Sequence, residues 1–129
     1  MPADVVVSVP ARAEFLHVLR SVVASVAARL DFPYDAIEDL RIAVDEACAQ
    51  LLFQGKGATQ MRVRITPSAG GIDVVVSTDA ADVAWPPPKA EHSLAWQVIE
   101  ALCDRAVLER DDGAPAVRFS KAVPGGDVR

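Results

Sequence analysis

Two polar residues, Glu46 and Gln50, are spaced so that their side chains could take part in the same chemistry. They lie four residues apart in the segment YDAIEDLRIAVDEACAQLLF, residues 34–53, where apolar residues recur at steps of three and four. This periodicity predicts a helix, and residues four apart on a helix lie one above the other on the same face. A carboxylate can accept a proton and an amide can donate and accept hydrogen bonds, so this pair is the candidate chemical centre.

The predicted helix also determines what surrounds this pair. Its main apolar stripe must pack against a core and consists of Ile37, Leu40, Val44, Ala47, Cys48 and Leu51. Glu46 and Gln50 fall on a different face of the helix. Their apolar neighbours on that face are Ile42, Ala49 and Phe53. The sequence therefore predicts a polar pair that is partly enclosed by apolar side chains.

The composition limits the kinds of protein that this chain can be. Its 129 residues suit one domain, and 51% hydrophobic residues suffice for a core. The formal net charge of −5 argues against direct binding to nucleic acid or to an anionic membrane, because both need a basic surface. The first residues, MPADVVVSVP, contain neither a basic region nor an apolar run that could cross a bilayer. We therefore expect a cytoplasmic protein without a signal peptide or membrane anchor.

The two cysteines, Cys48 and Cys103, both fall on predicted core faces of helices. We therefore expect buried thiols in a reducing compartment and not a disulfide. No cysteine or histidine spacing suits zinc, so no metal centre is expected.

The remaining segments predict helices and strands on both sides of the central helix. In chain order the predicted elements are a strand at 5–10, helices at 11–30 and 34–53, a hairpin at 61–77, a helix at 92–104 and a hairpin at 106–122. The first strand ends at a proline, which suits a sheet edge. The helix at 92–104 is expected to bury Leu94, Val98, Ala101 and Leu102.

This order of elements predicts an α+β fold. We expect a two-layer sandwich in which helices cover one face of a mixed, mostly antiparallel sheet. The single domain would span residues 1–123, and residues 124–129 would form a disordered tail.

The run DLRIAVDEACAQLL, residues 39–52, resembles the N-box helix of the anti-sigma-factor serine kinases, the RsbW and SpoIIAB type within the GHKL ATPase fold. The N-box follows roughly the pattern D-I-x-x-A-V-x-E-A-x-x-N-A. The similarity extends from the first strand to about residue 122, with the same element order and an equivalent last helix at residues 94–109, LAWQVIEALCDRAVLE. The resemblance implies the fold of this family and a homodimer.

The resemblance assigns roles to individual residues by their position. Glu46 matches the N-box glutamate, which implies a general base toward a serine hydroxyl of an antagonist protein. Gln50 replaces an asparagine that helps to hold Mg²⁺, and its extra methylene displaces the amide from an ion that requires ligand distances of about 2.0–2.1 Å. Arg20 matches a first-helix arginine that contacts both the sigma factor and the antagonist.

The other two ATP motifs have lost their glycines. The family's D-x-G-x-G, whose aspartate binds adenine, corresponds to DAADV at residues 79–83, where only Asp79 remains. The family's G-x-G, which brings bare backbone to the phosphates, corresponds to the run from Ser93 to Ala95. We therefore interpret Gln50, Asp79, Ser93 and Ala95 as a vestigial ATP site. ATP and Mg²⁺ are expected only if that site still functions.

The resulting hypothesis is an anti-sigma factor that sequesters an alternative sigma factor, is regulated by partner switching and has no kinase activity. One alternative is an active ATP-dependent serine kinase that phosphorylates an STAS-type anti-anti-sigma factor, with Glu46 as its base. A second alternative is a sensor whose altered pocket binds a small ligand such as a nucleotide.

Overall fold

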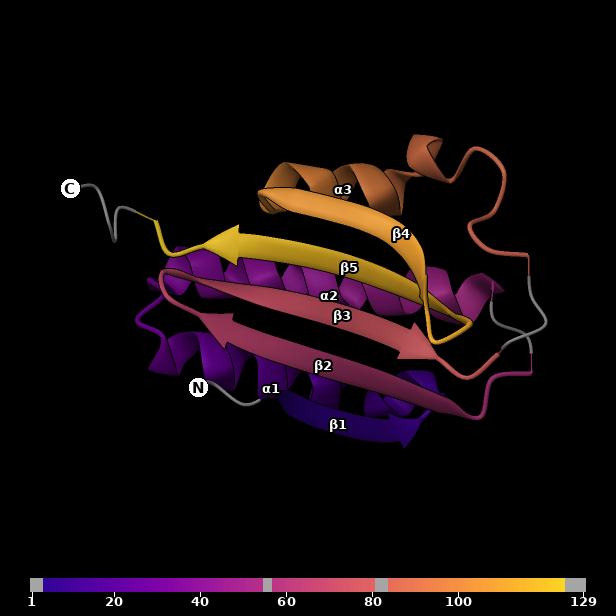
Figure 1. Cartoon of the computed structure of the whole chain (residues 1–129), viewed down its shortest axis with the longest axis horizontal. Helices are drawn as coiled ribbons and strands as arrows, with labels where there is room; N and C mark the ends of the chain where they lie inside the picture. Colours follow the sequence, from indigo (N-terminus) through magenta and orange to yellow (C-terminus); the bar gives the residue numbers. More distant parts are fainter. Residues whose placement is uncertain (1–3, 55–56, 81–83, 125–129) are drawn as a thin grey trace.

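In the computed structural model, which describes residues 4–54, 57–80 and 84–124, one layer of helices packs against one β-sheet (Figure 1). The strands are β1 (Val5–Pro10), β2 (Gln60–Ser68), β3 (Gly71–Thr78), β4 (Arg105–Asp111) and β5 (Ala114–Ala122). The helices are α1 (Leu16–Arg29), α2 (Tyr34–Gln54) and α3 (Leu94–Leu102), with short 3₁₀ turns at Ala13–Phe15 and Ala90–His92. The predicted two-layer α+β sandwich is confirmed.

The sheet has the strand order β1-β2-β3-β5-β4, so β1 lies at an edge as predicted. All four neighbouring strand pairs are antiparallel, and the parallel pairing that a mixed sheet requires is not found among the described strands. The reason is the position of β5. Strands β3 and β4, which are connected through α3, run in the same direction, but β5 inserts between them and pairs antiparallel with both.

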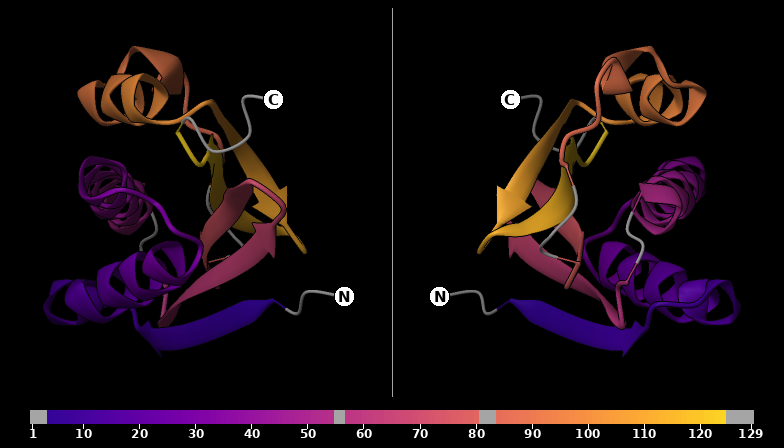
Figure 2. Two further views of the ribbon diagram at one scale, coloured as in Figure 1. Left: turned by 90° about the vertical axis from the view of Figure 1, so that its left-hand side faces the viewer. Right: turned by 90° about the vertical axis from the view of Figure 1, so that its right-hand side faces the viewer.

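The three helices lie on the same side of the sheet, and the other sheet face is open (Figure 2). The core fills the space between the helices and the inward-facing residues of the central strands. Its fully buried strand residues include Met61, Val63, Ile65, Val74, Val76, Val117 and Phe119. Alternation along β2 produces this arrangement, because Arg62 and Arg64 point to the opposite face from Met61 and Val63.

Helix α2 buries most of the stripe that its periodicity predicts. Leu40, Val44, Ala47, Cys48 and Leu51 are at most 1% exposed, and Ile37 packs against their cluster from its margin. Helix α2 lies between α1 and α3 (Figure 2), so it contacts both helices as well as the sheet. It is therefore the central element of the helical layer.

The predicted core face of the last helix was only partly right. Leu102 packs against the core cluster and Val98 is half-buried, but Leu94 is 77% exposed and Ala101 is exposed. Trp96 and Ile99 are buried instead. The helix begins at Leu94 because Ser93 caps it, with the Ser93 Oγ accepting a hydrogen bond from the Trp96 backbone N–H at 3.1 Å. From that start, Trp96 and Ile99 lie three residues apart on the side that faces the core.

Two other boundaries can be compared with the sequence. The first helix begins at Leu16, after a 3₁₀ turn, and not at residue 11. The predicted tail at 124–129 lies outside the described residues except for Pro124.

Leu40 provides a test of the packing between α2 and the sheet. It is fully buried, so Leu40→Ala should lower the free energy of unfolding by about 2–5 kcal/mol, measured by urea denaturation with circular dichroism. The matched control on the same helix is Ile42→Ala, because Ile42 is 42% exposed and its truncation should change stability by only about 0.5 kcal/mol. Equal effects of the two changes would contradict the orientation of α2.

Candidate functional site

Glu46 and Gln50 occupy different environments although they share a face of α2. Gln50 is 9% exposed, whereas Glu46 is half-buried. Within the part of the chain that the structure describes, the Glu46 carboxylate has no hydrogen-bond or ion-pair partner, and the buried Gln50 Oε1 has no hydrogen bond. An unsatisfied buried polar atom costs about 1–3 kcal/mol, so Gln50 carries a local energetic deficit.

Gln50 lines a cavity of about 420 Å³ between the C-terminal end of α2 and the start of α3. The lining residues are Ala49, Gln50 and Phe53 from α2, Pro87 to Ala90 from the preceding loop, and Ser93 and Ala95. Most of these side chains are apolar, and Lys89 is the cation among them. The structure thus brings together Gln50, Ser93 and Ala95, three of the four residues that we interpreted as a vestigial ATP site.

Asp79, the fourth of these residues, is not among the cavity's lining and is occupied elsewhere. Its carboxylate accepts hydrogen bonds from the backbone N–H groups of Thr59 at 2.7 Å and Gln60 at 3.1 Å, and from the Thr59 hydroxyl. The Thr59 side-chain hydrogen bond is the main reason that the pKa of Asp79 lies below its ordinary value. Asp79 therefore joins the end of β3 to the start of β2. The rest of its motif, residues 81–83, lies outside the described residues.

Two polar groups at the start of α3 and in the loop before it are satisfied within the chain. The Ser93 hydroxyl oxygen caps α3 by accepting a hydrogen bond from the Trp96 backbone N–H, so the Trp96 N–H is not available to an anion. The buried Trp85 donates a hydrogen bond from Nε1 to the Ala116 carbonyl at 3.2 Å, which attaches the loop to β5. Both tryptophans belong to the core cluster.

The residues around this cavity do not fit Mg-ATP. Asp79, the expected adenine ligand, is tied to the segment before β2, and the walls that would meet the phosphates are apolar apart from Lys89, Gln50 and Ser93. Several negative charges against such walls would be poorly compensated. Among the described residues no group of three or more histidine, cysteine, aspartate or glutamate side chains is placed to hold a metal ion.

Arg20 lies outside this cavity, on the surface that α1 and α2 share. Its guanidinium pairs with the Asp45 carboxylate at 2.9 Å, and each side chain is a little over a third exposed. Sequence spacing contains no signal for this pair, because its members are 25 residues apart on separate helices.

Both cysteines are buried free thiols, as the sequence predicted. Burial raises the pKa of Cys48 to about 12, with the nearby Asp45 carboxylate acting in the same direction. Burial likewise raises the pKa of Cys103 to about 12. Because the thiolate is the reactive form, neither residue is suited to act as a nucleophile.

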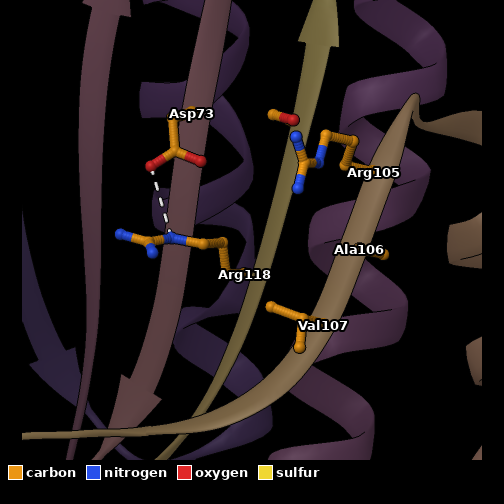
Figure 3. A pocket seen from close by; sticks show the side chains of 6 residues that line it. Asp73, Arg105, Ala106, Val107 and Arg118 are labelled. Carbon is orange, nitrogen blue, oxygen red and sulfur yellow. Dashed lines mark ion pairs between the residues drawn. The ribbon is translucent and has the colours of Figure 1, made fainter.

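A second hollow lies on the open face of the sheet, where Arg105 of β4 extends toward β5 and Arg118 turns toward Asp73 (Figure 3). The Arg118 Nε lies 3.4 Å from the Asp73 carboxylate, and its Nη1 lies 3.8 Å from the Glu109 carboxylate. These acids compensate the charge of Arg118, so the hollow is not a strongly basic surface. None of the residues that the sequence proposed for the ATP site lies there.

Residues 9–121 match the histidine kinase-like ATPase domain family. The chain belongs to this family. The match confirms the predicted ATPase fold family, and two similar proteins confirm the resemblance to the RsbW type. Anti-sigma-F factor RsbW of Mycobacterium tuberculosis is 33% identical over 115 residues, which cover 88% of this chain and 66% of the relative. Serine-protein kinase RsbW of Halalkalibacterium halodurans is 45% identical over 51 residues, or 40% of this chain and 32% of that protein.

A segment of the chain is also similar to serine-protein kinase RsbW of Bacillus thuringiensis, at 46% identity over 44 residues, or 34% of this chain and 28% of the relative. The chain therefore spans at most about two thirds of the length of these relatives. No helix within the described ranges combines the length and apolar character needed to cross a membrane.

Asp79→Asn tests the link between β3 and β2 through its pH dependence. Since the folded pKa lies below the ordinary 3.8, the carboxylate contributes stability above that pH and loses the contribution as pH falls through the folded pKa. The free energy of unfolding, measured between pH 2 and 6, should therefore fall less steeply in Asp79→Asn than in the wild type. Glu100→Gln, on the exposed face of α3, should keep the wild-type slope. Identical slopes for wild type and Asp79→Asn would exclude this role.

Proposed function

We propose that this protein is an anti-sigma factor that sequesters an alternative sigma factor by direct binding and works without kinase activity. The similarity to anti-sigma-F factor RsbW over 88% of the chain supports the binding role. The observation that carries the absence of kinase activity is the engagement of Asp79 by Thr59 and Gln60, which removes the expected adenine ligand from the cavity.

Sequestration requires a complementary surface and no catalytic site. The proposed surface includes Arg20, whose guanidinium is held at the border of α1 and α2 by Asp45 and stays partly exposed. An arginine ordered in this way loses less side-chain freedom when it meets a carboxylate of a partner. The protein would act in the cytoplasm as a homodimer. An STAS-type anti-anti-sigma protein would bind this protein in competition with the sigma factor and so release the sigma factor.

An active serine kinase is the second candidate. It is favoured by the similarity of part of the chain to proteins named serine-protein kinase RsbW and by the half-buried Glu46, whose carboxylate is unpaired among the described residues. Such a kinase needs Mg-ATP, with Gln50 and Asp79 in its nucleotide site and Glu46 as the general base. The two candidates therefore differ in nucleotide binding.

Calorimetric titration of Mg-ATP distinguishes them. We expect no saturable heat at concentrations that detect affinities into the high micromolar range, because the cavity lacks the adenine ligand and a compensating cation cluster. Circular dichroism of the same sample provides the control for folding. Saturable binding that Glu46→Ala leaves intact, together with phosphorylation that Glu46→Ala abolishes, would establish the kinase instead.

Binding of the alternative sigma factors from the source genome tests sequestration. If Arg20 is a central contact, Arg20→Ala should weaken binding about tenfold, measured by biolayer interferometry. Arg29→Ala, at an exposed position of the same helix, should leave binding unchanged. Asp45→Ala separates direct contact from the ion pair, because it removes the pair and its ordering effect but keeps the Arg20 guanidinium available to the partner. Absence of binding to every sigma factor would refute the proposal.

A further inference from the structure

The cavity between α2 and α3 has the composition of a small-molecule site. Its volume of about 420 Å³ lies within the range of about 300–1,000 Å³ that is typical of ligand pockets. Its apolar lining comes from Ala49, Phe53, Pro87, Pro88, Ala90 and Ala95. Ligand sites usually combine such walls with a few polar groups that orient the ligand, so the polar groups here indicate what would bind.

Three polar side chains contribute to the lining. Gln50 is buried, and its Oε1 makes no hydrogen bond within the described part of the chain. Lys89 is exposed, and no ion-pair partner for it exists among the described residues. Ser93 accepts a hydrogen bond from Trp96 and keeps its own hydroxyl proton available for donation. The Gln50 Oε1 atom itself is buried, so the cavity offers a ligand one positive charge from Lys89 and one hydroxyl donor from Ser93.

Phe53 adds an aromatic surface to this cavity. Its side chain is 80% exposed and lines the apolar hollow, so its ring is accessible to a ligand there. A ligand that covered the ring would remove apolar surface from water, and an aromatic ligand would also stack on it. The site therefore favours a ligand with a flat apolar body.

We infer that this cavity binds a small aromatic monoanion, such as an aromatic carboxylate, in place of a nucleotide. The aromatic body lies between Phe53 and the proline-rich loop, the single negative charge meets Lys89, and the Ser93 hydroxyl donates a hydrogen bond to the ligand. One cation matches one negative charge, whereas the several charges of a triphosphate would face apolar walls. This inference does not depend on sigma factor binding.

Fluorescence titration with anilinonaphthalene sulfonate tests the inference, because this probe combines an aromatic body, one N–H group and one negative charge. We expect saturable one-site binding to the full chain. Ala49→Phe should weaken binding about tenfold or more by filling the cavity from α2. Ala28→Phe is the matched control, since Ala28 is equally exposed in the separate groove between α1 and α2, and it should bind as the wild type does.

The role of Lys89 is tested by charge. Lys89→Gln should weaken binding of the sulfonate about two- to fivefold, and Lys89→Arg should restore it. Phenylnaphthylamine, the neutral analogue, should bind the wild type less tightly than the sulfonate, and its binding should be insensitive to Lys89→Gln.

Three outcomes would overturn the inference. Equal affinity of wild type and Ala49→Phe for the sulfonate would refute the site, and equal binding of both probes would refute the requirement for an anion. Displacement of the probe by Mg-ATP would show a nucleotide site and would contradict the absence of kinase chemistry, whatever the result with sigma factors.

Discussion

The packing of α2 against the sheet is the constraint on which the rest of the structure depends. Leu40, Val44 and Ala47 are fully buried in the same core as the inward-facing residues of β2, β3 and β5. Because this stripe must face the sheet, the rotation of α2 about its own axis is determined. That rotation leaves Gln50 at the border of the core and Glu46 half-exposed. The exposure of Glu46 and Gln50 is thus a consequence of the way α2 packs on the core.

Two residues that the resemblance places at the ATP site serve the stability of the chain itself here. Asp79 accepts hydrogen bonds from Thr59 and Gln60, and the hydroxyl of Ser93 caps the helix that begins after it. A side chain that is satisfied internally gains little from a ligand, because the ligand must first replace an existing hydrogen bond. Stability of the loops and nucleotide binding therefore compete for the same few groups.

The proposed protein-binding surface does not depend on the competition between loop stability and nucleotide binding. Arg20 and Asp45 form their ion pair on the outer part of the helical layer, and neither residue lines the cavity. Changes in the loop from Pro87 to Ala90 can therefore alter what enters the cavity without altering the surface of α1 and α2. Such separation is physically reasonable in a family in which a fold supports both binding and catalysis.

The sequence by itself determined the features that depend on local periodicity. The apolar stripe of α2, the alternation of Met61 and Val63 with arginines, and the family signature around Glu46 all follow from residues close in the chain, and they were sufficient for the two-layer fold. Only the tertiary structure decided which distant groups meet. It inserted β5 between β3 and β4, turned Trp96 toward the core in place of Leu94, and joined Asp79 to Thr59 across 20 residues. These outcomes depend on strand order and on the rotation of each helix against its neighbours, and no local repeat in the sequence encodes either one.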